Sequence, residues 1–204
     1  MEKNLFFDKH NVSRETMNCL ENYVDLLIKW NQSINLISKH TINQIWDRHV
    51  LDSAQLVRFI DKDVRKWVDL GSGAGFPGLI VASIVKDSIP KLCVSLVESD
   101  QRKCVFLRQA ADLLKVNVEI FAGRVQDCSF KNADIISARA LAPIKKLLPY
   151  FIQIGKTKGA KALFLKGKNI NRELQDVEDL EQFNIKTYPS LVDESGFVLE
   201  VEKR

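Results

Sequence analysis

A glycine-rich loop constrains the fold of this chain more than any other feature. A strand-like apolar run ends at Asp69, and residues 79–85, after the loop, are mostly apolar with helical character. Because glycine tolerates positive φ and has no Cβ, such a loop can turn sharply and present bare backbone N–H groups to a ligand. We therefore predict a strand, a loop and a helix, with a nucleotide-type ligand at the loop. The loop holds four glycines within eight residues: Gly71, Gly73, Gly75 and Gly78.

Composition limits the class of protein. A chain of 204 residues suggests one domain with room for an appendage, and 46% apolar residues are enough for a sizeable core. The four cysteines form neither a C-x-x-C pair nor a cluster with the three histidines, so we expect no disulfide framework and no metal site. The first ten residues lack a continuous apolar stretch, and no later segment reaches membrane-spanning length. These features predict a soluble, cytoplasmic protein, and we expect a monomer.

Charge is distributed unevenly along the chain. The formal net charge of +4 is modest and does not by itself identify a nucleic-acid partner. Residues 135–172, however, contain nine lysines or arginines and no acid, whereas acids accumulate from Glu173 onward. This asymmetry could present a positive face to phosphates, although a solvated lysine-rich surface explains the charge equally well.

Helical periodicity dominates the first sixty residues. Apolar residues recur at three- and four-residue spacing after Ser13, which is a suitable N-cap. Thr41 and Gln44 fit a capping box for a second helix, which should continue after a local bend as far as Ile60. We therefore predict a helical N-terminal subdomain at residues 1–63.

From Lys66 onward, strand-like apolar runs alternate with helical periodicity. This alternation indicates an α/β fold in which helices cover both faces of a parallel sheet and a ligand lies at the carboxyl ends of the strands. Two final runs, around Ser195 and Gly196, predict an antiparallel hairpin. The expected strands are 67–70, 93–97, 118–121, 134–137, 160–165, 184–189 and 197–201, with helices starting at Pro77, Gln101, Pro143 and Asn169.

The spacing of the glycines distinguishes between classes of nucleotide-type site. A dinucleotide-dependent oxidoreductase usually carries G-x-G-x-x-G, and this chain has Phe76 in place of the last glycine. Its G-x-G-x-G pattern after Asp69 instead resembles the first motif of class I methyltransferases, whose loop lies along the methionine and ribose of S-adenosylmethionine. An ordinary tight turn is a third interpretation. Glu98, at the end of the next strand, could accept hydrogen bonds from ribose hydroxyls in either enzyme class.

Four further residues are candidates because of their positions relative to the predicted strands and helices. Arg139 comes directly after an apolar strand run, at the functional end of the sheet. Val125 and Gln126 follow the third strand, where their backbone would flank an adenine ring. His49 has apolar neighbours at helical spacing, so a packed histidine is about as plausible as a functional one.

Seven motifs, in chain order, make the chain similar to one known family. It resembles the glucose-inhibited division protein B family, the bacterial small-subunit ribosomal RNA guanine-N7 methyltransferases. The similarity runs from about Trp30 to Lys168, and its GFPG and RHxLDS elements are more particular than a general methyltransferase loop. The motifs are WN (30–31), INLI (34–37), RHVLDS (48–53), DLGSGAGFPG (69–78), RKCVFLR (102–108), GRV (123–125) and ARA (138–140).

The resemblance implies a class I methyltransferase fold over residues 64–204, with S-adenosylmethionine as the cofactor. It also implies methyl transfer to N7 of a guanine in 16S ribosomal RNA, as naked RNA or within the small subunit. Gly73 and Glu98 enter the expected site from the local argument above, and the other residues enter by matching the family's motifs. The expected cofactor-binding residues are Gly71, Gly73, Phe76, Glu98, Val125, Gln126 and Arg139.

The chemistry of guanine N7 suits a site with few catalytic side chains. N7 has an exposed lone pair and no proton at neutral pH, so its attack on a sulfonium methyl group needs no general base. Positioning and desolvation should then dominate the rate. We expect Arg139 to be the catalytic residue, orienting the cofactor or the guanine rather than moving protons.

RNA contacts are expected from the basic segment and from the helical N-terminus. A surface position is the simpler interpretation of two of these residues, Arg102 and Lys103, which open a helix next to Glu98. The main alternative is a methyltransferase that acts on a small molecule or a protein, and a non-catalytic RNA-binding module is a further one. The expected RNA-binding residues are Arg48, His49, Arg102, Lys103 and Lys166.

Overall fold

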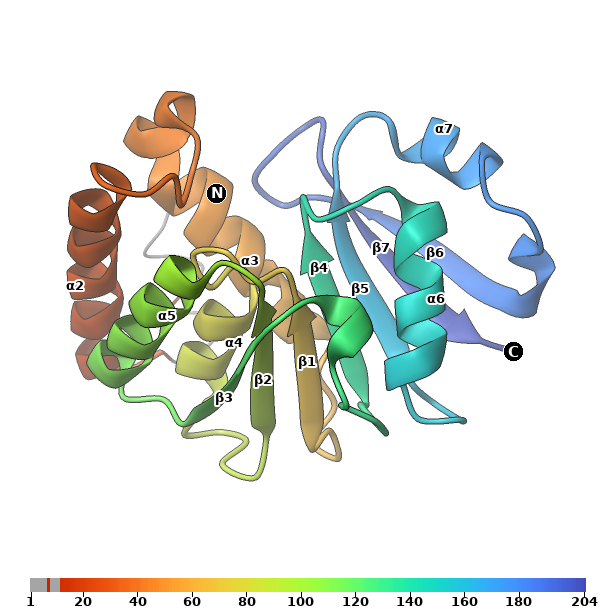
Figure 1. The fold of residues 1–204 in the computed structure, drawn as a ribbon, viewed down its shortest axis with the longest axis horizontal. Helices are drawn as coiled ribbons and strands as arrows, with labels where there is room; N and C mark the ends of the chain where they lie inside the picture. The colour runs from red at the N-terminus through yellow and green to blue at the C-terminus, as the bar shows by residue number, and fades with distance from the viewer. Residues whose placement is uncertain (1–6, 8–11) are drawn as a thin grey trace.

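A seven-stranded sheet forms the centre of the computed structural model, which describes Phe7 and residues 12–204. The strand order is β3-β2-β1-β4-β5-β7-β6 (Figure 1). All seven predicted strands are confirmed to within two residues at each end. They are β1 (Lys66–Leu70), β2 (Cys93–Glu98), β3 (Val118–Ala122), β4 (Ile135–Arg139), β5 (Lys161–Lys166), β6 (Phe183–Pro189) and β7 (Phe197–Lys203).

The first five strands are parallel, as the alternation of strands and helices predicts. Strand β7 runs antiparallel to both β5 and β6, so the predicted terminal hairpin is also confirmed. Strand β4 extends to Arg139, which is therefore its last residue instead of the first residue after it. The carboxyl ends of β1, β2 and β4 consequently meet at one edge of the sheet.

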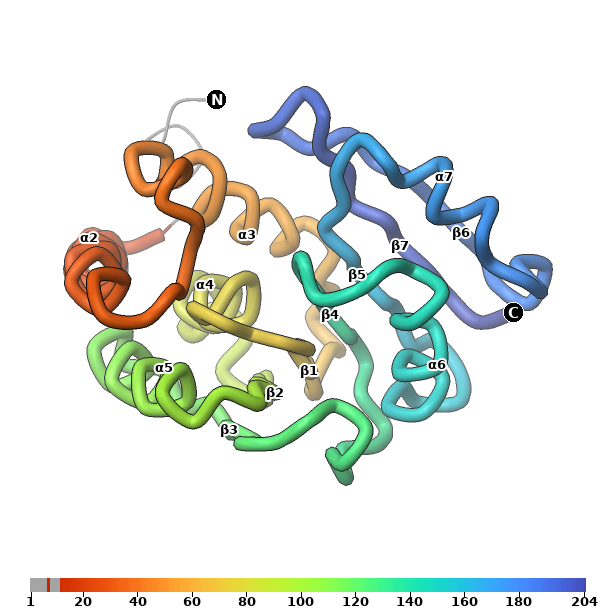
Figure 2. The backbone as a smooth tube through the Cα atoms, turned by 45° about the horizontal axis from the view of Figure 1, so that its top comes forward, coloured from red at the N-terminus to blue at the C-terminus, as the bar shows by residue number. Residues whose placement is uncertain are grey.

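Helices cover both faces of the sheet. Figure 2 shows α4 and α5 on one face with α2 outside them, and α6 on the opposite face. Ser13 caps α2 as predicted, since its side chain accepts a hydrogen bond from the backbone N–H of Thr16. Pro77 immediately precedes α4, one residue outside the position that the sequence predicts. The bounds are α2 (Arg14–Asn31), α4 (Gly78–Val85), α5 (Gln101–Leu114), α6 (Ile144–Ile154) and α7 (Ile170–Gln175).

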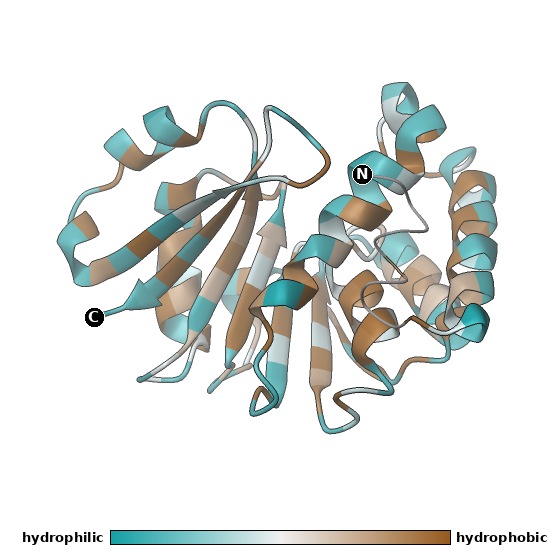
Figure 3. Cartoon of the chain, turned by 180° about the vertical axis from the view of Figure 1, so that it is seen from behind, coloured by the Kyte–Doolittle hydropathy of each residue, from teal (hydrophilic) through white to brown (hydrophobic). Residues whose placement is uncertain are grey.

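Alternate strand residues feed two hydrophobic cores, one on each face of the sheet. Trp67 packs into the core beneath α2, α4 and α5, and Val68 packs into the core beneath α6. The central strands are hydrophobic along most of their length because both faces are covered (Figure 3). Tyr23 of α2 donates a 2.6 Å hydrogen bond to the carbonyl of Ala74 in the glycine loop. The N-terminal helices thus support the loop directly, and a domain boundary at residue 63 stays a prediction.

The segment between α2 and β1 differs from the predicted second helix. It consists of four short helical pieces, and the predicted capping box at Thr41 is wrong. Thr41 lies inside the first piece and its hydroxyl donates to the carbonyl of Ser38, which has no side-chain capping bond of its own. The pieces are η1 (Lys39–Gln44, a 3₁₀-helix), η2 (Trp46–Leu51, a π-helix), α3 (Asp52–Ala54) and η3 (Gln55–Phe59, a 3₁₀-helix).

None of the helices in the described part of the chain has both the length and the apolar character needed to span a membrane.

Candidate active site

The glycine loop joins β1 to α4 through residues with left-handed backbone conformation. Gly71, Gly73 and Gly75 have φ values of +66°, +56° and +93°, which side-chain-bearing residues rarely adopt. Gly78 serves close packing instead. A Cβ at this position would lie 2.5 Å from Leu96 Cδ2 and 2.9 Å from Asp69 Cβ. The loop therefore requires glycine for two different physical reasons.

Asp69 anchors the loop from inside the protein. Its fully buried carboxylate accepts hydrogen bonds from the Ser137 hydroxyl at 2.6 Å and from the Gly78 N–H at 3.3 Å. The Trp67 indole N–H donates in turn to Ser137 at 2.7 Å. Burial raises the pKa of Asp69 to about 6, although these hydrogen bonds oppose the shift. Asp69 thus ties β1, β4 and α4 together and is not available to a ligand.

Glu98 ends β2 with its carboxylate directed at the glycine loop. One oxygen accepts from the Gly73 N–H at 2.9 Å, and the other accepts from the Asp100 N–H at 2.8 Å. Two charge-assisted bonds to backbone amides fix the carboxylate at the edge of the sheet. Each oxygen retains a lone pair, so the group can still accept hydrogen bonds from a diol.

A cavity of about 510 Å³ opens beside this carboxylate. Its volume is within the range of small-molecule sites, and the glycine loop and residues 123–126, which follow β3, contribute to its wall. Five of the expected cofactor-binding residues line it, together with Lys103, which the sequence suggested as an RNA contact. Sequence reasoning missed Arg124, Lys146 and Tyr150, of which Tyr150 receives a hydrogen bond from Gln126. The five expected residues are Gly71, Gly73, Glu98, Val125 and Gln126.

Phe76 and Arg139, the other two expected cofactor-binding residues, do not line this cavity. The Phe76 ring is buried and stacks on His49, with ring centroids 5.1 Å apart and an interplanar angle of 21°. The edge of Tyr23 packs against the same ring. Phe76 therefore supports the loop from behind, and Arg139 lies in a neighbouring cluster.

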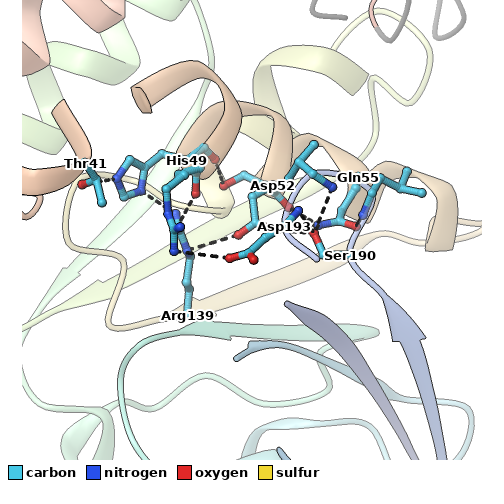
Figure 4. Close-up of polar contacts among 11 residues, drawn as sticks. Thr41, His49, Asp52, Gln55, Arg139, Ser190 and Asp193 are labelled. Atoms are coloured by element: carbon cyan, nitrogen blue, oxygen red, sulfur yellow. Dashed lines mark hydrogen bonds and ion pairs between the residues drawn. The ribbon is translucent and has the colours of Figure 1, made fainter. Parts of the chain in front are cut away.

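In that cluster, the Arg139 guanidinium interacts with three polar partners (Figure 4). Arg139 donates to His49 Nδ1 at 2.8 Å and to the backbone carbonyl of Arg48, and its Nε lies 3.5 Å from an Asp52 carboxylate oxygen. Arg139 also lies 5.8 Å from the centre of the Phe76 ring. Three polar partners and an aromatic face leave this side chain little freedom.

His49 is a neutral acceptor in the cluster. Because a guanidinium can only donate, His49 Nδ1 must accept, which leaves the proton on Nε2 to bond the Thr41 hydroxyl at 2.9 Å. Burial, together with the charges of Arg139 and Arg48, lowers the pKa of His49 to about 3. The histidine is therefore a packed, hydrogen-bonded residue, the first of the two interpretations that the sequence left open.

A second cavity, of about 520 Å³, lies on the other side of the loop that follows β4. Arg48, Arg139 and Lys166 line it, and Ala140, Leu141 and Ala142 line both cavities. The loop of residues 140–142 is thus a shared wall. Sequence reasoning missed three contributors to the second cavity, because they come from later parts of the chain: Glu173 of α7 and, from the β6–β7 loop, Asp193 and Gly196.

Comparison with known proteins identifies the family. A sequence model of GidB, described as rRNA small subunit methyltransferase G, matches residues 16–195. The chain belongs to the GidB family. Among curated relatives, the ribosomal RNA small subunit methyltransferase G of Jannaschia sp. is 45% identical over 92% of this chain and 89% of the relative. That of Cereibacter sphaeroides (strain ATCC 17025) is 43% identical over 94% of this chain and 92% of the relative.

Solved structures agree on the fold. The ribosomal protein L11 methylase of Lactobacillus delbrueckii superimposes with a TM-score of 0.62 at 13% identity, covering 82% of this chain and 81% of that one. A SAM-dependent methyltransferase of Aquifex aeolicus gives 0.61 at 14% identity, covering 82% of this chain and all of that one. M. jannaschii TYW2, solved with AdoMet, gives 0.56 at 14% identity, covering 85% and 80%. This GidB-family chain is an S-adenosylmethionine-dependent methyltransferase with a Rossmann-like fold.

The expected RNA-binding residues of this GidB-family chain lie in different surroundings. Arg102 is 70% exposed and pairs with Asp100, the N-cap of α5, at 3.2 Å. Arg48 is half-exposed at the second cavity and lies 3.3 Å from Asp193. His49 is buried, as described above, and Lys166 is nearly buried. His49 and Lys166 are thus mostly covered, whereas Arg48 and Arg102 are open to a polyanion.

The basic segment 135–172 does not form one positive face. Lys156 pairs with Asp134 at 2.6 Å and Lys161 with Asp61 at 3.5 Å, near the amino ends of β4 and β5. Both lysines therefore lie at the edge of the sheet opposite the two cavities. An acid-free stretch of sequence is thus neutralised by acids from elsewhere in the chain.

Proposed function

We propose that this chain transfers a methyl group from S-adenosylmethionine to N7 of a guanine in 16S ribosomal RNA. The relatives' names support a small-subunit ribosomal RNA substrate. The observation that carries the proposal is the pair of cavities of similar volume on either side of residues 140–142. One cavity suits a nucleoside cofactor and the other a flipped-out base, with only a thin loop between them.

The cofactor site rests on this chain's own donor and acceptor groups. Glu98 would accept the ribose hydroxyls with the lone pairs that Gly73 and Asp100 leave free. Val125 and Gln126 would flank the adenine, and Gly71 would lie along the methionine portion. When bound, S-adenosylmethionine supplies an electrophilic methyl group on a sulfonium.

Positioning, rather than proton transfer, is the proposed role of Arg139. Guanine N7 carries no proton at neutral pH, and both ring nitrogens of neighbouring His49 are already hydrogen-bonded. Asp52 is held by Arg139, and burial raises its pKa while Arg139 opposes the shift. A fixed guanidinium at the second cavity can orient an incoming guanine or its phosphate without any base.

RNA binding would involve the exposed basic residues near the cavities, chiefly Arg48 and Arg102, with Lys103 between the RNA and the cofactor site. Binding should therefore weaken steeply as salt is raised. We also propose that the enzyme acts as a monomer. A ribosomal RNA or small-subunit substrate supports a cytoplasmic location.

One assay tests the proposal. The protein is incubated with methyl-labelled S-adenosylmethionine and unmodified small ribosomal subunits or naked 16S RNA, and the nucleosides are analysed by mass spectrometry. We expect labelled 7-methylguanosine at one position. We expect Arg139→Lys to lower kcat/KM by about 10- to 100-fold, since an ammonium cannot bond Asp52, His49 and the Arg48 carbonyl at once. Label in another nucleoside, or full activity in the variant, would contradict the proposal or the role of Arg139.

A further inference from the structure

An ion pair between Lys166 and Glu173 lines the second cavity, next to the wall that both cavities share. Lys166 ends β5 and Glu173 belongs to α7, and their charged atoms are 2.7 Å apart. The Lys166 side chain is only 9% exposed and that of Glu173 only 25%. A buried charge pair needs good geometry and further hydrogen bonds to offset its desolvation.

Each member of the pair has one such further bond and one atom left over. Lys166 donates a second hydrogen to the Ala142 carbonyl at 2.8 Å, on the shared wall. The same Glu173 oxygen that bonds Lys166 also accepts from the Ile144 N–H at 2.9 Å. Among the described residues, the third Lys166 hydrogen and the other Glu173 carboxylate oxygen have no partner. The pair therefore keeps one donor and one acceptor uncommitted, on two bonded residues that both line the cavity.

We propose that Lys166 and Glu173 determine the base specificity of the enzyme by binding the O6 and N1–H edge of the target guanine. This inference rests on the proposed function, since it requires a guanine in the second cavity. Lys166 donates to O6, and Glu173 accepts from N1–H. Because Lys166 touches Ala142 of the shared wall, O6 and the adjacent N7 lie toward the cofactor cavity.

Guanine is the purine that matches this arrangement. It carries an acceptor at O6 beside a donor at N1, whereas adenine carries a donor at N6 beside an acceptor at N1. Adenine would therefore place a donor against Lys166 and an acceptor against Glu173, and would leave the third Lys166 hydrogen and the second Glu173 oxygen without bonds. Sites that use polar groups in this way reject the wrong ligand more strongly than apolar pockets do.

The alternative role for Lys166, a contact to RNA phosphate, fits less well. Glu173 neutralises Lys166 at 2.7 Å, and a carboxylate in the same cavity would repel a phosphate. A neutral pair with a free donor and a free acceptor suits the edge of an uncharged base instead. Helix α7 thereby gains a role, and the GidB family model, which matches residues 16–195, includes it. The similarity thus extends past Lys168, the limit expected from the sequence motifs.

The test uses Lys166→Met and Glu173→Gln with two substrates. Once the wild-type enzyme has defined the modified position, the small-subunit RNA is built with guanosine or 2-aminopurine riboside there. The analogue keeps N7 but lacks O6 and N1–H. We expect each substitution to lower kcat/KM on guanosine by about 10- to 100-fold and to have almost no effect on the analogue, because the lost contact is absent there already.

A structural role for the pair predicts a different result. Equal losses on guanosine and on the analogue would mean that the pair only supports the fold, and would overturn the inference. The controls are Lys145→Met and Glu178→Gln, a similar ion pair of 3.0 Å on the exposed surface, which should leave both substrates unaffected. Cofactor affinity by calorimetry should be unchanged in all four variants. If the wild-type enzyme makes no 7-methylguanosine, the proposed function fails first and independently.

Discussion

His49 links the protein's stability to pH. Burial holds its pKa at about 3 in the folded chain, against 6.5 for the free side chain. Between these values the unfolded chain binds a proton that the folded chain does not, so His49 makes the protein less stable as pH falls below 6.5. We predict that His49→Gln removes a slope of about 1.4 kcal/mol per pH unit from the free energy of unfolding in this window. Urea titrations between pH 7.5 and 4.5 measure it.

Asp69 contributes a pH dependence of stability with the opposite sign to that of His49. Its folded pKa of about 6 lies above the usual 3.8, so between these values the folded chain binds the extra proton and gains stability as pH falls. The wild-type protein combines both effects with opposite signs. In His49→Gln the contribution of Asp69 remains, and stability should fall less, or rise, on acidification. Parallel curves for variant and wild type would show that His49 titrates normally.

Single residues were predictable where position along a strand determines their place. Glu98 and Arg139 end the parallel strands β2 and β4, which lie on either side of β1, so the alternation of elements alone brings them to the same edge. The surroundings of a side chain were not predictable in this way. Phe76 and His49 pack on each other from segments nearly thirty residues apart, and Lys166 meets its acid on the next helix.

A substitution at Gly78 tests the packing at the junction between the glycine loop and α4. We predict that Gly78→Ala destabilises the protein by about 1–3 kcal/mol, because a Cβ there would overlap Leu96 and Asp69 in the core. Cofactor affinity should fall as well, since Asp69 would have to move away from the loop. Thermal unfolding and calorimetric titration with S-adenosylmethionine measure the two effects.

Gly167 provides the matched control for this substitution. A Cβ there would meet nothing within 4 Å, so Gly167→Ala should change stability by no more than about 0.5 kcal/mol. Equal stability of the two variants would show that the loop adjusts to a side chain at position 78. In that case its tight packing would not explain the glycine.

At the level of whole elements, apolar runs predicted the strands well, because a strand buried on both faces consists of an almost unbroken run of apolar residues. The same signal failed for residues 39–59. Periodicity reports which residues face the core, and 3₁₀-, α- and π-turns can all present the same residues to it. The hydrogen bonds that select among them, such as the one from Thr41 to Ser38, depend on partners that spacing does not reveal.

Charge along the chain was a poor guide to charge on the folded surface. The acid-free segment suggested a continuous basic face, yet four of its lysines pair with acids from other segments. The fold brings together residues that are distant in sequence, and local charge counts omit those partners. The site is also assembled from separate segments of the chain, because the N-terminal helical residues, β4 and the terminal hairpin all meet around Arg139.

Gln55 joins two parts of this site that are far apart in the sequence. Its buried side chain donates to Ser190 Oγ at 3.1 Å and accepts from the Leu191 N–H at 3.0 Å, so that η3 holds the β6–β7 loop against the second cavity. We predict that Gln55→Leu destabilises the protein by about 1–3 kcal/mol, because it leaves buried polar groups without partners. Ser190→Ala should cost less, and the two effects should be coupled by at least about 0.5 kcal/mol.

A double-mutant cycle measured by urea unfolding gives this coupling. Ser195 lies in the same loop and bonds Asp193 but not Gln55, so a cycle of Gln55→Leu with Ser195→Ala should be additive within about 0.5 kcal/mol. Additivity in both cycles would mean that the hairpin loop moves independently of the N-terminal helices in solution. Coupling in the first cycle alone would show that η3 and the β6–β7 loop together support one wall of the second cavity. In that case kcat should fall with Gln55→Leu.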